Sequence, residues 1–289
     1  MHLRQRFFWL VCVLWAAMDP ARAAEPEKDA FECNRLLGRG VNLGNALDAP
    51  REGEWGFVLQ EKYFDLIKQA GFNSVRIPIR WSTHADAQAP YTIDPEFFKR
   101  VDWAIEQALS RGLTAVIDVH HYEEIYKEPE KNLPRLNAIW RQIAERYRDR
   151  SDQLFFEILN EPHDALTDTL WQKMIPELLG VIRQSNPRRI VIVGPGHWNT
   201  PGQLEWFEPP AEDRRLIIAI HYYDPFHFTH QGASWVAGSD QWLGTTWEGT
   251  PQQLEALRSG LEKAAAWAKK NQRPLFLGEF GSYSAAPMD

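Results

Sequence analysis

Two glutamates lie directly after short apolar runs that are far apart in the chain. Glu161 follows the run Leu154–Leu159 and precedes Pro162, which cannot continue a strand ladder. Glu279 follows the run Leu275–Gly278. Cleavage of a glycosidic bond needs two carboxyl groups across a cleft, one to protonate the departing oxygen and one to meet the developing positive charge. Either glutamate alone would be read as a surface residue, so the pair is a hypothesis that depends on the fold.

Seven short β-rich runs alternate along the chain with amphipathic helical stretches. Most of the runs are continuously apolar, which is typical of strands covered on both faces in a parallel sheet. The runs are Gly38–Leu43, Ser74–Ile79, Thr114–His120, Leu154–Leu159, Ile190–Val193, Leu216–His221 and Leu275–Gly278. The helical stretches are Gln60–Ala70, Pro95–Arg111, Leu133–Arg150, Asp168–Gln184 and Thr250–Asn271. No linker interrupts this alternation, so we expect one α/β domain, either a barrel or a doubly wound sheet.

The residues at the ends of these runs favour the barrel. Polar or aromatic side chains follow almost every run, namely Asn45, Arg76, His120 with His121, Asn160 with Glu161, His197 with Trp198, His221 with Tyr223, and Glu279. In a (β/α)8 barrel these positions converge on one face, where the active sites of that fold lie. A doubly wound sheet would instead place its chemistry at one switch point, after a glycine-rich loop that opens a helix. The glycines of Gly38–Gly44 precede or lie within the first run, so we reject that alternative.

The number of strands raises a further expectation. A complete barrel has eight strands, whereas only Ser282–Asp289 follow the seventh run, too few residues for a crossover helix and a closing strand. We therefore expect an α/β (β/α)8 TIM barrel that spans residues 24–289 and is truncated before its eighth strand. The alternative, a sheet left open between the first and seventh strands, would expose two unpaired edges.

The first 23 residues have the pattern of a secretory signal peptide. A basic start is followed by the apolar run Phe7–Met18 and by Ala21-Arg22-Ala23, a small-residue cleavage site. The apolar run is too short to span a bilayer comfortably, although an uncleaved N-terminal anchor remains the alternative. We expect an extracellular or periplasmic protein. Cleavage would remove Cys12 and leave Cys33 without an intrachain partner, so disulfides are not expected to stabilise it.

Composition restricts the classes of partner. The 289 residues carry 32 Lys and Arg against 39 Asp and Glu, and the net charge of −7 argues against nucleic acid or an anionic membrane as partner. Thirteen tryptophans are an unusual number, and the indole N–H makes tryptophan costly in a core. We expect some of them to line a binding surface for a neutral substrate, in a monomer without nucleic-acid or membrane partners.

Six motifs in register resemble glycoside hydrolase family 5, the cellulase family of retaining β-glycanases. They are Gly40-Val41-Asn42-Leu43-Gly44-Asn45, Arg76-Ile77-Pro78, Asp118-Val119-His120-His121, Asn160-Glu161-Pro162, His221-Tyr222-Tyr223 and Gly278-Glu279-Phe280-Gly281. The resemblance covers residues 36–281 and implies that Glu161 is the acid/base and Glu279 the nucleophile. It also implies supporting roles for Arg76, His120, Asn160, His221 and Tyr223, and substrate contacts for Asn45, Asp48, His121, Trp198 and Trp235.

These roles agree with the chemistry of the residues. Arg76 would keep Glu279 ionised while Glu161 stays protonated, which separates the two pKa values as the reaction requires. Asn160 can donate to a sugar hydroxyl or to the nucleophile, and Tyr223 can donate to Glu279. Flat tryptophan faces stack on glucopyranose rings, which suits a linear β-linked polysaccharide.

The resemblance implies a secreted, retaining endo-β-1,4-glucanase without cofactor or metal. The alternatives are a β-1,4-mannanase or mixed glucanase/mannanase, and an inactive carbohydrate-binding fragment. Asp118, His120, His121 and His221 could also be read as a zinc cluster. We expect no metal, because no His-x-His motif is present and the other strand ends lack further ligands.

Overall fold

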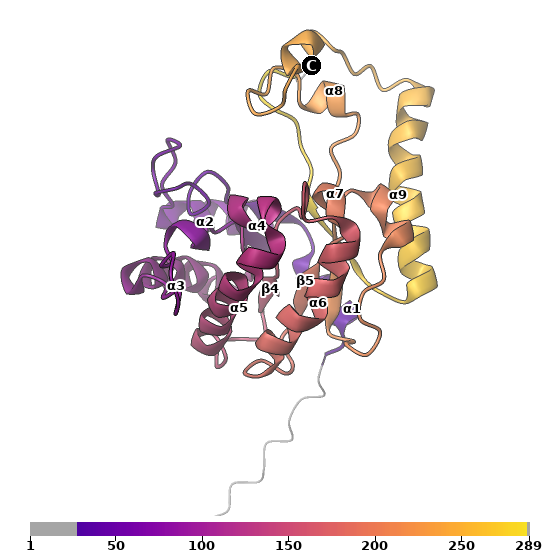
Figure 1. The fold of residues 1–289 in the computed structure, drawn as a ribbon. Helices are drawn as coiled ribbons and strands as arrows, with labels where there is room; N and C mark the ends of the chain where they lie inside the picture. The colour runs from indigo at the N-terminus through magenta and orange to yellow at the C-terminus, as the bar shows by residue number, and fades with distance from the viewer. Residues whose placement is uncertain (1–27, 288–289) are drawn as a thin grey trace, which may run out of the picture.

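The computed structural model describes residues 28–287, which form seven parallel strands flanked by helices (Figure 1). The strands are hydrogen-bonded in chain order, and they are β1 (Gly40–Asn42), β2 (Ser74–Ile77), β3 (Thr114–Asp118), β4 (Leu154–Glu157), β5 (Val191–Val193), β6 (Leu216–His221) and β7 (Leu275–Glu279). The expected strand–helix alternation and parallel sheet are confirmed. The predicted signal peptide, residues 1–23, lies outside the described residues.

Long helices connect successive strands and pack outside the sheet. They are α2 (Glu61–Gln69), α3 (Pro95–Ser110), α5 (Pro129–Arg146), α6 (Asp168–Arg183) and α9 (Pro251–Asn271), joined by the short helices α4 (Glu123–Lys127), α7 (Gly196–Asn199) and α8 (Phe226–Thr229). Three 3-10 turns are η1 (Trp81–Thr83), η2 (Pro201–Trp206) and η3 (Ser239–Trp242). The expected Leu133–Arg150 is shifted by four residues at both ends, because Pro129 can open α5 and Tyr147 closes it.

A helix that the sequence analysis did not anticipate covers one end of the strands. Residues 24–34 are polar on average, yet α1 (Ala30–Leu37) begins with a capping box in which Asp29 and Glu32 exchange hydrogen bonds. Its buried residues Ala30, Cys33 and Leu37 pack into a cluster with Val116, Phe155, Ile192, Ile217 and Ala219 from four strands. The helix therefore closes the strand bundle at the end opposite the candidate site, and Cys33 serves there as a buried free thiol.

The two outer strands differ from the five inner ones. Strands β2, β3, β4, β5 and β6 are buried along their whole length, as expected, whereas β1 and β7 are largely half-buried or exposed. In the described part of the chain no ladder pairs β1 with β7. A cavity of about 680 Å³ lies between them, and the Asn42 amide crosses it to donate to the Gly278 carbonyl at 2.9 Å. The barrel is thus nearly closed, with a seam between its first and seventh strands.

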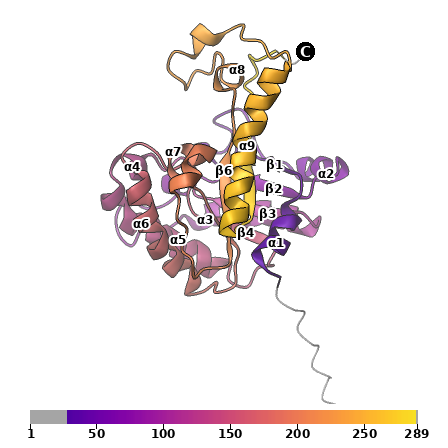
Figure 2. The same ribbon diagram turned by 90° about the vertical axis from the view of Figure 1, so that its right-hand side faces the viewer.

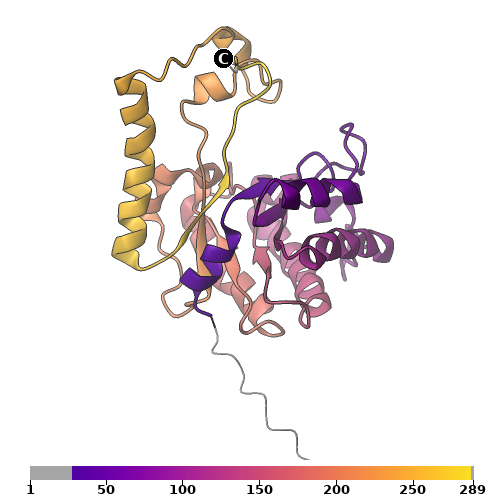
Figure 3. The ribbon, with the colours of Figure 1, turned by 180° about the vertical axis from the view of Figure 1, so that it is seen from behind.

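The long connection between β6 and α9 stands away from the body of the molecule. Figures 2 and 3 show α8 in this projecting lobe, with the last described residues beside it and α9 running back along one side. Tyr283 donates its backbone N–H to the Thr229 carbonyl at 2.7 Å, which fastens the C-terminal segment to the lobe. Helix α9 packs lightly, since only Ala264 among its residues is buried.

Within residues 28–287, every helix is too short or too polar to cross a lipid bilayer.

We expect Arg189 to be essential for stability, because its buried guanidinium holds the loop between α5 and β4. It donates to four backbone carbonyls, those of Tyr147, Arg150, Ser151 and Leu154. Arg189→Leu should lower the free energy of unfolding in urea by about 2–4 kcal/mol, since it leaves these acceptors without their donor. The neighbouring Arg188 is exposed, so Arg188→Leu should change it by less than about 0.5 kcal/mol. Equal effects of the two substitutions would contradict this account.

Candidate active site

The guanidinium of Arg76 is the centre of the candidate site. Arg76 lies inside β2, not after it as the sequence analysis expected, because the alternation of β2 turns Arg76 into the barrel while its neighbours Val75 and Ile77 face the helices. Its side chain is 2% exposed. Its N–H groups reach two carboxylates, Glu157 on β4 at 2.6 and 3.1 Å and Asp118 on β3 at 2.7 Å.

Arg76 also reaches three groups around the mouth of the site. It donates to Glu279 Oε1 at 2.8 Å, Asn160 Oδ1 at 2.8 Å and Asn42 Oδ1 at 3.1 Å. Burial alone would lower the pKa of Arg76, but the carboxylates outweigh it and raise that pKa well above its usual value. The side chain is therefore a permanent cation that joins β1, β2, β3, β4 and β7.

Glu279 is the last residue of β7, and both of its carboxylate oxygens are engaged. Oε1 accepts from Arg76, and Oε2 accepts from the Tyr223 hydroxyl at 2.7 Å. Burial alone would raise the pKa of Glu279, but the neighbouring His221, Arg76 and His120 groups and the tyrosine hydrogen bond lower it well below its usual value. This carboxylate is therefore ionised across the ordinary pH range, and its side chain remains 16% exposed.

Glu161 faces the same space from the loop after β4. Strand β4 ends four residues earlier, at Glu157, and Glu161 adopts a left-handed backbone conformation with φ 45°. Its Oε1 accepts from Nδ1 of His221 at 2.7 Å, and the same nitrogen lies 3.6 Å from Glu279 Oε2. His221 thus stands between the two glutamates, with carboxylate oxygens of the two lying within 4.8 Å of one another.

The histidines after β3 form the neighbouring wall. His120 is buried, and its Nδ1 lies 2.7 Å from Asp118 Oδ2. Burial would lower the pKa of His120, but Asp118 outweighs it and raises that pKa. The next residue, His121, is half-buried, and burial together with the charge of His120 lowers its pKa to about 3. His121 is therefore a neutral ring at any ordinary pH.

Asp48 and Asn45 lie in the loop after β1, on the same side as His121. Asp48 is buried, and its carboxylate accepts the backbone N–H groups of Asn45 at 3.0 Å and Ala46 at 2.8 Å. It lies 4.0 Å from Nε2 of His121. Asp48 therefore shapes the loop, while Asn45, exposed and at φ 63°, is the residue of this pair that is open to solvent.

Of the two predicted aromatic contacts, Trp198 lies beside Glu161 and Trp235 lies in the projecting lobe. Trp198 is 45% exposed, stacks on His163 at 4.9 Å between ring centroids, and donates its backbone N–H to Pro162 beside Glu161. Trp235 is 65% exposed and packs edge-on against Tyr283 in the projecting lobe. Trp55 is exposed and lies edge-on to His121, with 5.5 Å between the ring centroids.

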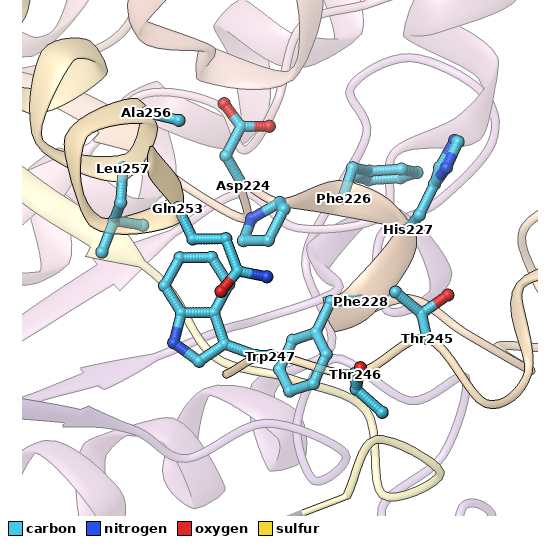
Figure 4. A pocket seen from close by; sticks show the side chains of 11 residues that line it. Asp224, Phe226, His227, Phe228, Thr245, Thr246, Trp247, Gln253, Ala256 and Leu257 are labelled. Carbon is cyan, nitrogen blue, oxygen red and sulfur yellow. The ribbon is translucent and has the colours of Figure 1, made fainter. Parts of the chain in front are cut away.

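Other tryptophans lie apart from the two glutamates. Figure 4 shows a cavity of about 500 Å³ between the projecting lobe and α9, where Trp247 lies with Phe228, Asp224 and Gln253. None of the predicted site residues lines it. Trp140 is fully buried, and Trp103 and Trp267 pack against the core from their helices.

Two residues of the site escaped the sequence analysis. Glu157 and Asn42 both contact Arg76. Glu157 lies inside a run that was read only as apolar strand, and Asn42 belongs to the Gly40–Asn45 motif but was given no role of its own. The signal was available for Glu157, because a charged residue in the buried run Leu154–Leu159 needs a buried partner of opposite charge. For Asn42 the motif was available, and the structure adds its two contacts, with Arg76 and with the Gly278 carbonyl.

Two sets of side chains bring possible metal ligands together. One is Asp48, His120 and His121, and the other is Glu161, His221 and Glu279; within each set the donor atoms lie within 4.8 Å of one another. In the second set His221 Nδ1 is already hydrogen-bonded to Glu161 at 2.7 Å, so a metal would have to displace that proton. In the first set Asp48 already accepts two backbone N–H groups. Both sets are thus organised as hydrogen-bonding networks.

The parallel barrel is nearly closed, and it presents Glu161, Glu279 and the histidine between them at the carboxyl ends of its strands. This is the architecture of the (β/α)8 glycoside hydrolases. The family model for cellulase (glycosyl hydrolase family 5) matches residues 39–288. The chain belongs to this family, which confirms the expected resemblance and fold class.

Relatives and solved structures agree with this assignment. The chain is 40% identical to endoglucanase H of Acetivibrio thermocellus over 92% of its own length, and 31% identical to cellulase/esterase CelE of the same organism over 84%. It spans only 28% and 31% of the lengths of these two relatives. The structure of Thermotoga maritima Cel5A in complex with cellobiose is 50% identical and superposes with a TM-score of 0.88, covering 90% of this chain and 84% of that one.

The hydrogen bond from Tyr223 gives a prediction about Glu279. Tyr223→Phe removes a donor to the ionised carboxylate, so the pKa of Glu279 should rise by about one unit. The measurement is a carbon-13 NMR titration of the glutamate carboxyl groups, assigned with Glu279→Gln. The matched control is Tyr222→Phe, because the Tyr222 hydroxyl donates to the Leu257 carbonyl instead. An unchanged Glu279 titration in Tyr223→Phe would show that the tyrosine does not stabilise the charge.

Proposed function

We propose that this chain hydrolyses internal β-1,4 bonds of glucans with retention of configuration, with Glu161 as acid/base and Glu279 as nucleophile. The observation that carries the proposal is the separation of the two carboxylates, whose oxygens approach within 4.8 Å. Retaining glycosidases have carboxyl groups about 5–5.5 Å apart, whereas inverting enzymes need about 6.5–9.5 Å to admit a water molecule. This upper bound on the nearest oxygen–oxygen distance is compatible with the closer arrangement, which is the one that double displacement requires.

In the first step the Glu279 carboxylate attacks the anomeric carbon, the bond from that carbon to the glycosidic oxygen breaks, and Glu161 gives its proton to the departing oxygen. In the second step Glu161 takes a proton from water, and the resulting hydroxide displaces Glu279 from the sugar. The depressed pKa of Glu279 supports its role, because the nucleophile has to be ionised when substrate binds.

The surrounding groups have matching tasks. Asn160 uses its side-chain oxygen to accept from Arg76, which leaves its amide nitrogen to donate to the substrate. The Tyr223 hydroxyl and Arg76 orient Glu279 from opposite oxygens. The neutral ring of His121 and the exposed side chain of Asn45 are placed to hydrogen-bond sugar hydroxyls farther along the cleft, where Asp48 holds the loop.

Glucan is the substrate that the comparisons favour. The relatives above are named endoglucanase and cellulase, and the solved Cel5A structure contains cellobiose. The exposed rings of Trp55, Trp198 and Trp235 suit a linear chain of β-linked sugars. A second candidate is β-1,4-mannan, because Cel5A of Thermotoga maritima has also been solved with mannotriose.

We further propose that the protein is exported as a monomer, with residues 1–23 as a cleaved signal peptide and residues 24–289 as the catalytic barrel. The pattern of the N-terminal sequence supports export.

The test of the proposed function is hydrolysis of defined polysaccharides by one preparation. We expect reducing sugar from carboxymethylcellulose, with a fall in viscosity that outpaces sugar release because internal bonds are cut. If the rate on galactomannan is lower than the rate on carboxymethylcellulose, the protein is a glucanase. If it is higher, the protein is a mannanase. If the protein binds cellulose but does not hydrolyse it, the proposal is overturned in favour of a carbohydrate-binding fragment.

The role of Glu279 has its own test. Glu279→Gly should lower turnover by several orders of magnitude, because the covalent step has lost its nucleophile. Azide should restore turnover of dinitrophenyl β-cellobioside by attacking the anomeric carbon from the vacated side, and the product should be the α-glycosyl azide, identified by proton NMR. Glu262→Gly, on the exposed face of α9, is the control and should be neither slowed nor rescued. Formation of a β-glycosyl azide would contradict the assignment.

A further inference from the structure

The side chain of Asn199 contacts the ring of His221 from behind the two glutamates. Asn199 is fully buried at the end of α7, and its Nδ2 lies 3.4 Å from Nε2 of His221. The other ring nitrogen of His221 is the one that faces Glu161 at 2.7 Å. Both nitrogens of His221 therefore have a partner, a carboxylate on one side and an amide on the other.

The two partners together select one protonation state of the ring. A carboxylate accepts hydrogen bonds, so Nδ1 must carry a proton to bond Glu161. An amide NH₂ group donates, so Nε2 must offer a lone pair to bond Asn199. Only the neutral ring with its proton on Nδ1 satisfies both. In the imidazolium form, a ring N–H and an amide N–H would face each other as two donors.

We propose that Asn199 is a positioning residue for the reaction, which holds His221 in its neutral, Nδ1-protonated form and thereby aims that proton at Glu161. This inference rests on the proposed acid/base role of Glu161. A neutral donor orients the carboxyl group of Glu161 without fixing a negative charge on it, whereas an imidazolium at 2.7 Å would favour the ionised form. Glu161 has to be protonated when the leaving sugar departs.

The charges around His221 explain why such a residue is needed. Burial favours the neutral ring, but Glu279 and Glu161 outweigh it and raise the pKa of His221, while Arg76 opposes them. Glu157 on β4 also lies within the field of the ring. An amide donor at Nε2 of His221 favours the neutral ring, as burial and Arg76 also do. Asn199 is the group on α7 that supplies it.

The backbone around Asn199 is shaped to bring its amide there. His197, Trp198 and Asn199 all have positive φ, at 48°, 57° and 56°, although none of them is glycine. Left-handed backbone is unfavourable for residues other than glycine and persists only where other contacts hold it in place. The turn sends Trp198 outward, to stack on His163, and Asn199 inward, to His221.

The far side of the amide fits closely against β5. A Cβ on Gly194 would lie 2.5 Å from Asn199 Oδ1, so only glycine leaves room for this side chain. Oδ1 is buried and has no hydrogen-bond partner among the described residues. An unsatisfied buried acceptor is unfavourable. The site accepts this cost while the nitrogen of the same amide faces the histidine.

The direct test is nitrogen-15 NMR of the imidazole nitrogens in the wild-type protein at pH 7, with His221 assigned from His221→Gln. We expect the shifts of a neutral ring that is protonated on Nδ1. In Asn199→Asp, a carboxylate would face Nε2, and we expect both nitrogens to be protonated. An imidazolium in the wild-type protein, or the same ring state in both proteins, would overturn the proposal whatever the substrate proves to be.

The kinetic test separates positioning from a merely structural role. Asn199→Leu should lower kcat on carboxymethylcellulose by about ten- to a hundredfold, because Glu161 loses its oriented partner. It should slow dinitrophenyl β-cellobioside much less, since that leaving group needs no proton in the first step, and Glu161→Ala should show the same difference. In Asn199→Asp, the basic limb of the kcat/KM profile should move to lower pH, because an imidazolium beside the acid favours the ionised form of that acid.

Asn186→Leu is the matched control, since Asn186 is also a buried asparagine but its amide holds the Ala144 carbonyl far from the site. It should lower stability without changing the leaving-group dependence or the pH profile. Equal slowing of both substrates by Asn199→Leu would overturn the proposal. If the wild-type protein hydrolyses no polysaccharide while its His221 ring is neutral, with the proton on Nδ1 and none on Nε2, the proposed function fails. In that case the role of Asn199 in setting the protonation state of the ring stands.

Discussion

The structure depends on one buried cation. The guanidinium of Arg76 contacts side chains from four other strands, and without it three carboxylates would face one another at the centre of the barrel. Removing one partner from a buried ion pair typically costs about 3–5 kcal/mol, because the remaining charge is left uncompensated. Arg76 therefore couples folding to the site: the strands must be in register for its N–H groups to find their acceptors, and the acceptors include the candidate nucleophile.

The environment of Arg76 also separates the carboxylates into different tasks. Burial raises the pKa of Glu157 despite its contact with the guanidinium, whereas the pKa of Glu279 is held well below its usual value. The difference follows from their neighbours, since Glu279 also has His221, His120 and the Tyr223 hydroxyl around it. One cation thus stabilises a structural carboxyl group inside the barrel and a charged one at its mouth.

The sequence predicted the elements better than it predicted the contacts. Apolar runs located the seven strands and amphipathic stretches located the five long helices, because burial on both faces of a parallel strand leaves a strong local signal. Helix α1 was missed since its three buried residues are diluted by polar ones. Glu157 was missed for a different reason: its partner Arg76 lies 81 residues away, and no local pattern reports such a distance. The exact end of a strand also depends on its neighbours, so Glu161 was expected at a strand end and lies in a loop.

The candidate nucleophile belongs to one of the least buried strands, which makes hydrogen bonds more important than packing for its position. Strand β7 is half-buried along most of its length, and one of its edges faces the seam. Arg76 and Tyr223 hold the carboxylate of Glu279, while the Asn42 amide ties the backbone of Gly278 to β1 across the gap. Charge-assisted hydrogen bonds to a fixed cation can hold a carboxylate in one position even where the strand that carries it is paired on one side only. The hydrogen bonds at the mouth of the barrel therefore fix the position of the Glu279 carboxylate, whereas close packing in the interior helps to fix the positions of Asp118 and Glu157.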